Sequence, residues 1–171
     1  MANFSVVHLH DDRLDEAFPL VRMAAPEATP AQWRRFVGWL RDNDGGVLAA
    51  FADDPRPHGI AAFRSEQSLS QSRTLLVDPM VTFELNPSAP ARAALCEALE
   101  LIALAKGCEK LAIATPSRGY TDPAGPKAAA WADLGLAVTK VLLAKRLDSN
   151  LSIPRRARAA ADEPKPFAIE R

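Results

Sequence analysis

Residues 85–100 read LNPSAPARAALCEALE and join a loop of proline and small residues to the start of an apolar-periodic helix. A strand, a tight loop and a helix N-terminus form an anion site, because free backbone N–H groups and the helix dipole point at the same spot. The loop has no glycine, so Ala89 and Ala91 offer their N–H groups with methyl groups beside them. Pro90 has no N–H to offer, and Arg92 can offset this loss with a charge-assisted hydrogen bond to phosphate.

Two histidines and two cysteines are the other side chains that could bind a metal. His8 and His10 alternate along one predicted strand, a spacing that is compatible with a metal site, but no third ligand accompanies them. Cys96 and Cys108 have no companion Cys or His at metal-ligand spacing. We therefore expect no metal, no disulfide, and free thiols in a reducing cytoplasm.

Length and charge restrict the class of protein. A chain of 171 residues is long enough for one domain with a core that needs no metal or disulfide. Lys+Arg and Asp+Glu both number 21, so no global field favours nucleic acid or an anionic membrane. The N-terminus lacks a basic region followed by an apolar stretch, and no apolar run approaches membrane-spanning length. We expect a soluble cytoplasmic protein without a nucleic-acid or membrane partner.

The N-terminal elements that must support the site are a strand and two helices. Residues 4–9 are rich in β-forming side chains, and apolar residues then recur at helical spacing over 14–21. The next helix has a well-marked start. Thr29 can cap it, Pro30 suits its first position, and Gln32 completes a capping box.

A hairpin and a further strand are predicted next. Residues 47–52 and 58–63 are short apolar runs on either side of the loop sequence DDPRP, which predicts an antiparallel pair. The polar residues 65–72 then predict a loop. A strand follows over 74–83, and Pro79 within it indicates a bulge or an edge position.

The segment from the opening loop onward predicts a parallel strand pair. Helical periodicity runs from Ala91 to a stop at Gly107, and a strand follows over 110–115. A strand, a helix and a second strand in this order form a crossover unit, whose two strands are parallel. Strand 110–115 should therefore lie beside strand 74–83 in a mixed sheet.

The C-terminal part is expected to complete the domain and then leave it. A short helix over 127–134 ends at Gly135, and residues 136–147 predict one last strand or a strand pair. Residues 148–171 carry three prolines and mixed charge without an apolar stripe. We expect one domain over residues 1–147 and a mobile tail over 148–171 that folding does not require.

This order of elements resembles the GNAT superfamily of acyl-CoA-dependent N-acyltransferases over residues 4–147. The resemblance implies an α/β (α+β) fold with a mixed, mostly antiparallel sheet, a central parallel strand pair and flanking helices. Family members follow the fourth strand with a [Q/R]-x-x-G-x-[G/A] loop whose amides bind the coenzyme A pyrophosphate. In residues 86–91, Ala91 fits the last position of this pattern and Ala89 replaces its glycine.

A second family pattern, [F/Y]-Y-x-x-x-G-[F/L], matches residues 130–136. Gly135 and Leu136 are in place, and Trp131 stands where the family usually has tyrosine. An indole N–H donates a hydrogen bond but supplies no proton near neutral pH, so Trp131 cannot act as the acid. Direct acyl transfer can proceed without one, because proximity is commonly the larger contribution to the rate.

The resemblance implies an acyltransferase that uses acetyl-CoA or another acyl-CoA on a small-molecule or peptide amine. It places Val81 and Phe83 in the strand that pairs with the pantetheine arm, and Ala89, Ala91 and Arg92 at the pyrophosphate. The different-class alternative is a GNAT-like domain that has lost catalysis and serves as a binding or regulatory module. The sequence leaves the acceptor, the acyl chain and a homodimer open.

Proton transfer would fall to the remaining titratable side chains. Asp78, or Glu84 just beyond it, would take the amine proton through water, and Tyr120 would act as a displaced acid for the departing thiolate. Each also has a simpler interpretation. The two carboxylates suit solvated charges at a strand end, and Tyr120 suits surface packing.

Overall fold

A computed structural model describes residues 4–67, 72–83, 90–115 and 125–139 of the chain. The chain divides into two compact units, Met1–Val138 and Thr139–Arg171, and every helix and strand described here lies in the first. The strands are β1 (Ser5–His8), β2 (Gly46–Phe51), β3 (Pro57–Gln67), β4 (Arg73–Thr82) and β5 (Lys110–Ile113). The helices are α1 (Leu14–Ala24), α2 (Pro30–Asp42), α3 (Pro90–Ala105) and α4 (Pro126–Ala132), with a 3₁₀ turn at Asp11–Arg13.

The strands form one five-stranded mixed sheet in the order β1-β2-β3-β4-β5. The first three pairings are antiparallel, which confirms the predicted hairpin of β2 and β3. The β4–β5 pairing is parallel and joins Thr74 to Lys110 and Val77 to Ile113. This confirms the predicted crossover unit, because α3 connects the two strands.

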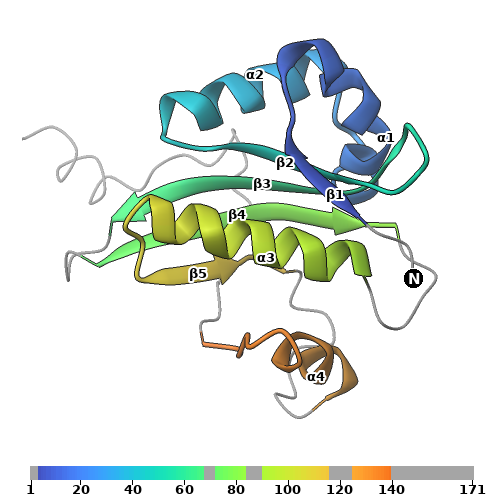
Figure 1. The fold of residues 1–171 in the computed structure, drawn as a ribbon. Helices are drawn as coiled ribbons and strands as arrows, with labels where there is room; N and C mark the ends of the chain where they lie inside the picture. Colours follow the sequence, from blue (N-terminus) through green and yellow to red (C-terminus); the bar gives the residue numbers. More distant parts are fainter. Residues whose placement is uncertain (1–3, 68–71, 84–89, 116–124, 140–171) are drawn as a thin grey trace, which may run out of the picture. The chain divides into compact units, whose positions relative to one another are not determined.

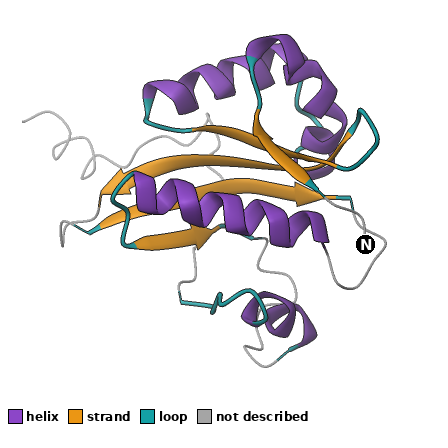
Figure 2. Ribbon diagram, in the orientation of Figure 1, coloured by secondary structure: helices purple, strands orange, loops and turns teal. Residues whose placement is uncertain are grey.

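Helices cover both faces of the sheet. α1 and α2 lie on one face and α3 lies on the other (Figure 1). The secondary-structure view shows the sheet between these helical layers (Figure 2). Alternate residues of β2 supply the two cores, since Val47 and Ala49 face α1 and α2, whereas Leu48 and Ala50 face α3. β2 has no solvent-facing side, and all of its residues are buried.

The start of α2 has the capping geometry that the sequence predicts. The backbone N–H of Gln32 donates to Thr29 Oγ1 at 3.3 Å, and the backbone N–H of Thr29 donates to Gln32 Oε1 at 2.8 Å. Trp33 then enters the core, where its indole N–H donates to the carbonyl oxygen of Leu14 at 3.0 Å. This hydrogen bond joins α1 to α2 and satisfies the polar atom of a buried side chain.

Two predictions of loop and strand need correction. The sequence predicts a polar loop over residues 65–72, but residues 65–67 belong to β3 and pair with residues 73–75 of β4. Backbone pairing with β4 extends β3 past Gly46, the first residue of β2. This part of β3 therefore needs no apolar side chains. Residues 136–139 follow α4 without forming the predicted last strand, and the rest of that prediction, 140–147, lies outside the described residues.

The tail prediction for residues 148–171 also lies outside the described residues. Among the helices that the structure describes, none is long and apolar enough to cross a membrane.

Candidate functional site

The parallel strands β4 and β5 pair only along the first half of β4. Their ladder covers Thr74–Val77, and the backbone N–H of Ala114 still donates to the carbonyl oxygen of Val77 at 2.9 Å. β5 ends at Ile113, whereas β4 continues to Thr82 beside β3. Backbone groups on a strand edge that leaves its ladder can pair with an extended ligand. We call this place, where β4 continues past the end of β5, the β4–β5 fork.

A β-bulge in β4 lies directly at the fork. Val77 pairs with Phe63 and Met80 pairs with Ala61, so Asp78 and Pro79 together stand opposite a single residue of β3. The predicted bulge at Pro79 is confirmed, and the Asp78–Pro79 peptide is cis. The extra residue reverses the alternation of the strand, because Val77 and Met80 both pack on the α3 side although they are three positions apart.

The predicted residues of β4 have different environments around this bulge. The side chain of Asp78 is exposed to solvent, as a residue that exchanges protons with water must be. Val81 is partly buried on the face that packs against α1 and α2. Phe83 follows the strand with 55% of its surface exposed, and its backbone N–H donates to the carbonyl oxygen of His58 at 2.7 Å. Phe83 is therefore a large, exposed apolar side chain at the end of β4.

The N-terminus of α3 supplies the predicted phosphate-binding residues that the structure describes. The helix begins at Pro90, and its first turn has no acidic residue. Ala91 is fully buried in the core between α3 and the sheet, so its methyl group packs inward. Arg92 is half-buried. The remaining predicted site residues, Glu84, Ala89 and Tyr120, lie outside the part of the chain that the structure describes.

Arg92 stacks on the aromatic ring of Trp131. The guanidinium carbon of Arg92 lies 5.0 Å from the centroid of the Trp131 ring, which is a cation–π distance. The contact joins the first turn of α3 to α4. Sequence reasoning excluded Trp131 as an acid but missed this role, because residue types alone do not reveal a contact between two separate helices.

Neither cysteine has the properties of a nucleophile. Cys96 and Cys108 are both buried free thiols. Burial raises the pKa of the Cys96 thiol to about 11, with a further contribution from Glu100, although Arg92 acts in the opposite direction. Cys96 is thus a neutral thiol near pH 7, and only the thiolate would attack a thioester.

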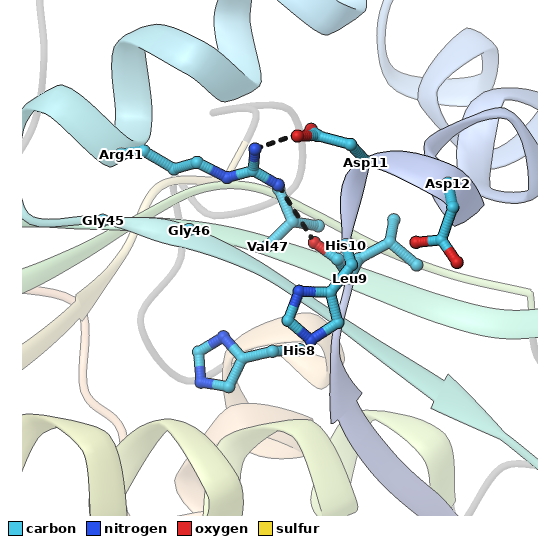
Figure 3. A pocket seen from close by; sticks show the side chains of 9 residues that line it. All are labelled: His8, Leu9, His10, Asp11, Asp12, Arg41, Gly45, Gly46 and Val47. Carbon is cyan, nitrogen blue, oxygen red and sulfur yellow. Dashed lines mark hydrogen bonds and ion pairs between the residues drawn. The ribbon is translucent and has the colours of Figure 1, made fainter.

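A pocket of about 490 Å³ lies at a different place, where β1 ends and β2 begins (Figure 3). Its lining residues are His8, Leu9, His10, Asp11, Asp12, Arg41, Gly45, Gly46 and Val47. Arg41 donates to a carboxylate oxygen of Asp11 at 2.6 Å, so these two charges of the pocket are paired. β3 lies between the two strands that line this pocket, β1 and β2, and the fork, and none of the residues predicted for acyl transfer or coenzyme binding lines the pocket.

The His8 ring packs edge-on against Phe63 with centroids 5.9 Å apart. Partial burial lowers the pKa of His8, and the nearby His10 and Lys106 lower it further. Within the described ranges, no three His, Cys, Asp or Glu side chains gather as a metal ligand set would require.

Several solved acetyltransferase structures share this arrangement of helices and strands. An aminoglycoside N-acetyltransferase in complex with CoA matches with a TM-score of 0.69 and 13% identity, covering 86% of this chain and 96% of that chain. The aminoglycoside antibiotic 6'-N-acetyltransferase from Acinetobacter baumannii matches with a TM-score of 0.68 and 11% identity, covering 85% and 99%. Glucosamine-6-phosphate N-acetyltransferase from Arabidopsis thaliana has a TM-score of 0.64 and 11% identity, covering 85% and 99%. No family model and no curated protein sequence matches the chain.

Proposed function

We propose that this chain, which has the fold of the GNAT superfamily that its order of elements predicted, is an acyl-CoA-dependent N-acyltransferase of the cytoplasm. Its co-substrate is acetyl-CoA or another acyl-CoA, and its acceptor is the amine of a small molecule or peptide. The observation that supports the proposal is the β4–β5 fork, where the second half of β4 pairs with β3 on one side and, among the described residues, has no strand partner on its other side.

The residues around the fork fit an elongated coenzyme with an anionic end. The edge of β4 past Val77 suits the amides of a pantetheine arm, with Val81 and Phe83 as apolar neighbours. The N-terminus of α3 and the guanidinium of Arg92 suit a pyrophosphate, because both carry positive charge. In this proposal the amides of Ala89 and Ala91 complete the phosphate site.

Acyl-CoA would supply the thioester carbonyl carbon, to which the amine nitrogen forms its new bond as the C–S bond breaks. Asp78 is exposed in the bulge beside this position and would accept the amine proton through water. Glu84 is the second choice for the same step. Tyr120 or solvent would return a proton to the thiolate that leaves.

Calorimetric titration of the purified protein with acetyl-CoA and with free CoA tests the binding part of the proposal. Arg92→Ala should weaken CoA binding by about 1–3 kcal/mol, the range for loss of a charge-assisted hydrogen bond. Arg34→Ala is the matched control, since Arg34 is an exposed α2 arginine that pairs with Asp15 at 2.6 Å. An Arg92→Ala variant that binds CoA as tightly as the wild type would remove Arg92 from the site.

The second candidate is a GNAT-like domain that binds a ligand without catalysis. The glycine-free loop and the tryptophan at the tyrosine position favour it. Turnover separates the two candidates. In an enzyme, Asp78→Asn should lower kcat by about 10²-fold or more and leave CoA affinity intact. Equal kcat for the wild type and Asp78→Asn would exclude Asp78 as the proton acceptor. Tight CoA binding without turnover on any amine would favour the binding module.

A further inference from the structure

We infer that Trp131 is a positioning residue of the coenzyme site, which holds the Arg92 guanidinium at the place where the pyrophosphate binds. The inference rests on the proposed function. It gives α4 a part in coenzyme binding that differs from the acid–base part of the family's tyrosine.

The geometry of the pair supports this role. Arg92 lies in the first turn of α3, Trp131 lies in α4, and the guanidinium stands 5.0 Å from the ring centroid. Tryptophan has the strongest quadrupole of the aromatic side chains, and a guanidinium within about 6 Å of its ring is attracted to the face. Both side chains are half-buried, so solvent screens the contact less than it would at a fully exposed position.

Stacking and phosphate binding use different parts of a guanidinium. The contact with an aromatic ring involves the flat face of the group, whereas its N–H donors point outward in the plane. An arginine can therefore stack on an indole and donate to phosphate oxygens at the same time. The ammonium of a lysine has no such flat face and acts as a point charge.

The sequence of the loop explains why this side chain needs to be held. A glycine-rich loop binds pyrophosphate with backbone amides, whose directions the backbone fixes. Here the loop has no glycine, and α3 begins at Pro90, which has no N–H. More of the binding must come from a long and flexible side chain. A ring that limits the rotamers of Arg92 reduces the conformational entropy that this side chain loses when the ligand binds.

The test compares two ligands in the variants Trp131→Leu and Trp131→Phe. Calorimetry measures the affinity for CoA and for pantetheine, which lacks the pyrophosphate. Trp131→Leu should weaken CoA binding by roughly 3- to 30-fold, as expected for loss of a cation–π contact. It should leave pantetheine affinity unchanged. Trp131→Phe keeps a ring face and should retain most of the CoA affinity.

A matched control exists on α2. Arg64 stacks on Trp39 with the guanidinium carbon 5.1 Å from the ring centroid, and Trp39 is 44% exposed. Trp39→Leu removes the same kind of contact between two residues that do not belong to the proposed coenzyme site. It should therefore not change CoA affinity. In the Arg92→Gln background, Trp131→Leu should have no further effect on CoA binding, because the group that it positions is gone.

Three results would overturn the inference. Unchanged CoA affinity in Trp131→Leu would show that the ring does not position Arg92. Equal loss of CoA and pantetheine affinity would assign Trp131 a structural role only. Additive effects of Trp131→Leu and Arg92→Gln would show that the two residues act separately. Absence of CoA binding by the wild-type protein would instead reject the proposed function, and the inference with it. If Trp131→Leu fails to fold, Trp131→Met takes its place in each of these comparisons, because methionine fills the space without offering a ring face.

Discussion

Replacement of Gly59 by alanine should destabilise the protein through one crowded position between the sheet and α3. Gly59 is a buried residue of β3 that pairs with Thr82 at the end of β4. A Cβ atom there would lie 2.9 Å from the Thr82 Cγ2, 3.0 Å from the Leu95 Cδ1 and 3.4 Å from the Val81 carbonyl oxygen. The first distance is too short for two carbon atoms and the second is tight, so the side chains of Thr82 and Leu95 must shift.

The expected magnitude follows from two opposing effects. Insertion of a methyl group into a packed core typically costs about 1–3 kcal/mol. Leu95 is fully buried and cannot move its side chain into solvent to relieve the contact. Alanine also restricts the unfolded chain more than glycine does, which raises the free energy of unfolding by about 0.4–1 kcal/mol. Gly59→Ala should therefore lower the free energy of unfolding by about 0.5–2 kcal/mol.

Urea unfolding at equilibrium measures this difference, with Gly38→Ala as the control. Gly38 lies inside α2, and a Cβ atom there meets nothing within 4 Å. Its replacement should raise the free energy of unfolding by about 0.5–1 kcal/mol, because alanine is the better helix former. The same chemical change should thus have opposite signs at the two positions. A Gly59→Ala protein at least as stable as the wild type, with an unchanged m-value, would refute the packing argument.

Three further predictions concern the rest of the fold. Thr29→Ala removes the cap of α2 and should cost about 1 kcal/mol in urea unfolding, whereas Thr29→Ser should cost much less. Asp44 forms ion pairs with Lys106 and with Arg73, the latter at 2.7 Å, and the hydrogen bond from Lys106 is the main cause of its lowered pKa. Its stabilisation should be present above the unfolded pKa of about 3.8 and be lost as pH falls below that value. Asparagine tolerates the positive φ of 56° at this position, so Asp44→Asn removes the charge without straining the backbone. The variant should lower the free energy of unfolding by about 0.2–1 kcal/mol at pH 7 and should not change it in strong acid. Urea unfolding at each pH measures the difference. Truncation before Asp148 should leave the melting temperature nearly unchanged, and a large fall would show that the tail packs on the domain.

The elements of the fold were predictable where local chemistry decides them. Thr29, Pro30 and Gln32 mark the start of α2 by groups within one turn, and the structure has each of their contacts. Gly107 ends α3 with a φ of +68°, as a glycine at a helix C-terminus should. The parallel pair of β4 and β5 followed from chain order alone, because a single crossover helix leaves few other arrangements.

The site was less predictable because tertiary contacts decide it. Pro79 indicated a bulge, but the reversed alternation after it depends on the register with β3, which no local pattern contains. The sequence predicts a loop at the end of β3, because the residues there lack the apolar alternation of a half-buried strand. The contact between Arg92 and Trp131 joins two helices whose relative position the sequence does not specify.

The complete burial of β2 has a consequence for amide hydrogen exchange. All six residues of β2 are buried between β1, β3 and both helical layers, whereas most of β1 is exposed. Amides at the centre of such a sheet exchange mainly when the whole unit unfolds, and those at its edges also exchange by local opening. A ligand that binds only the folded state raises the free energy of unfolding by RT ln(1 + [L]/Kd). The slowest amides of β2 should therefore report the proposed binding of a coenzyme at the β4–β5 fork, with protection factors that rise in proportion to 1 + [L]/Kd.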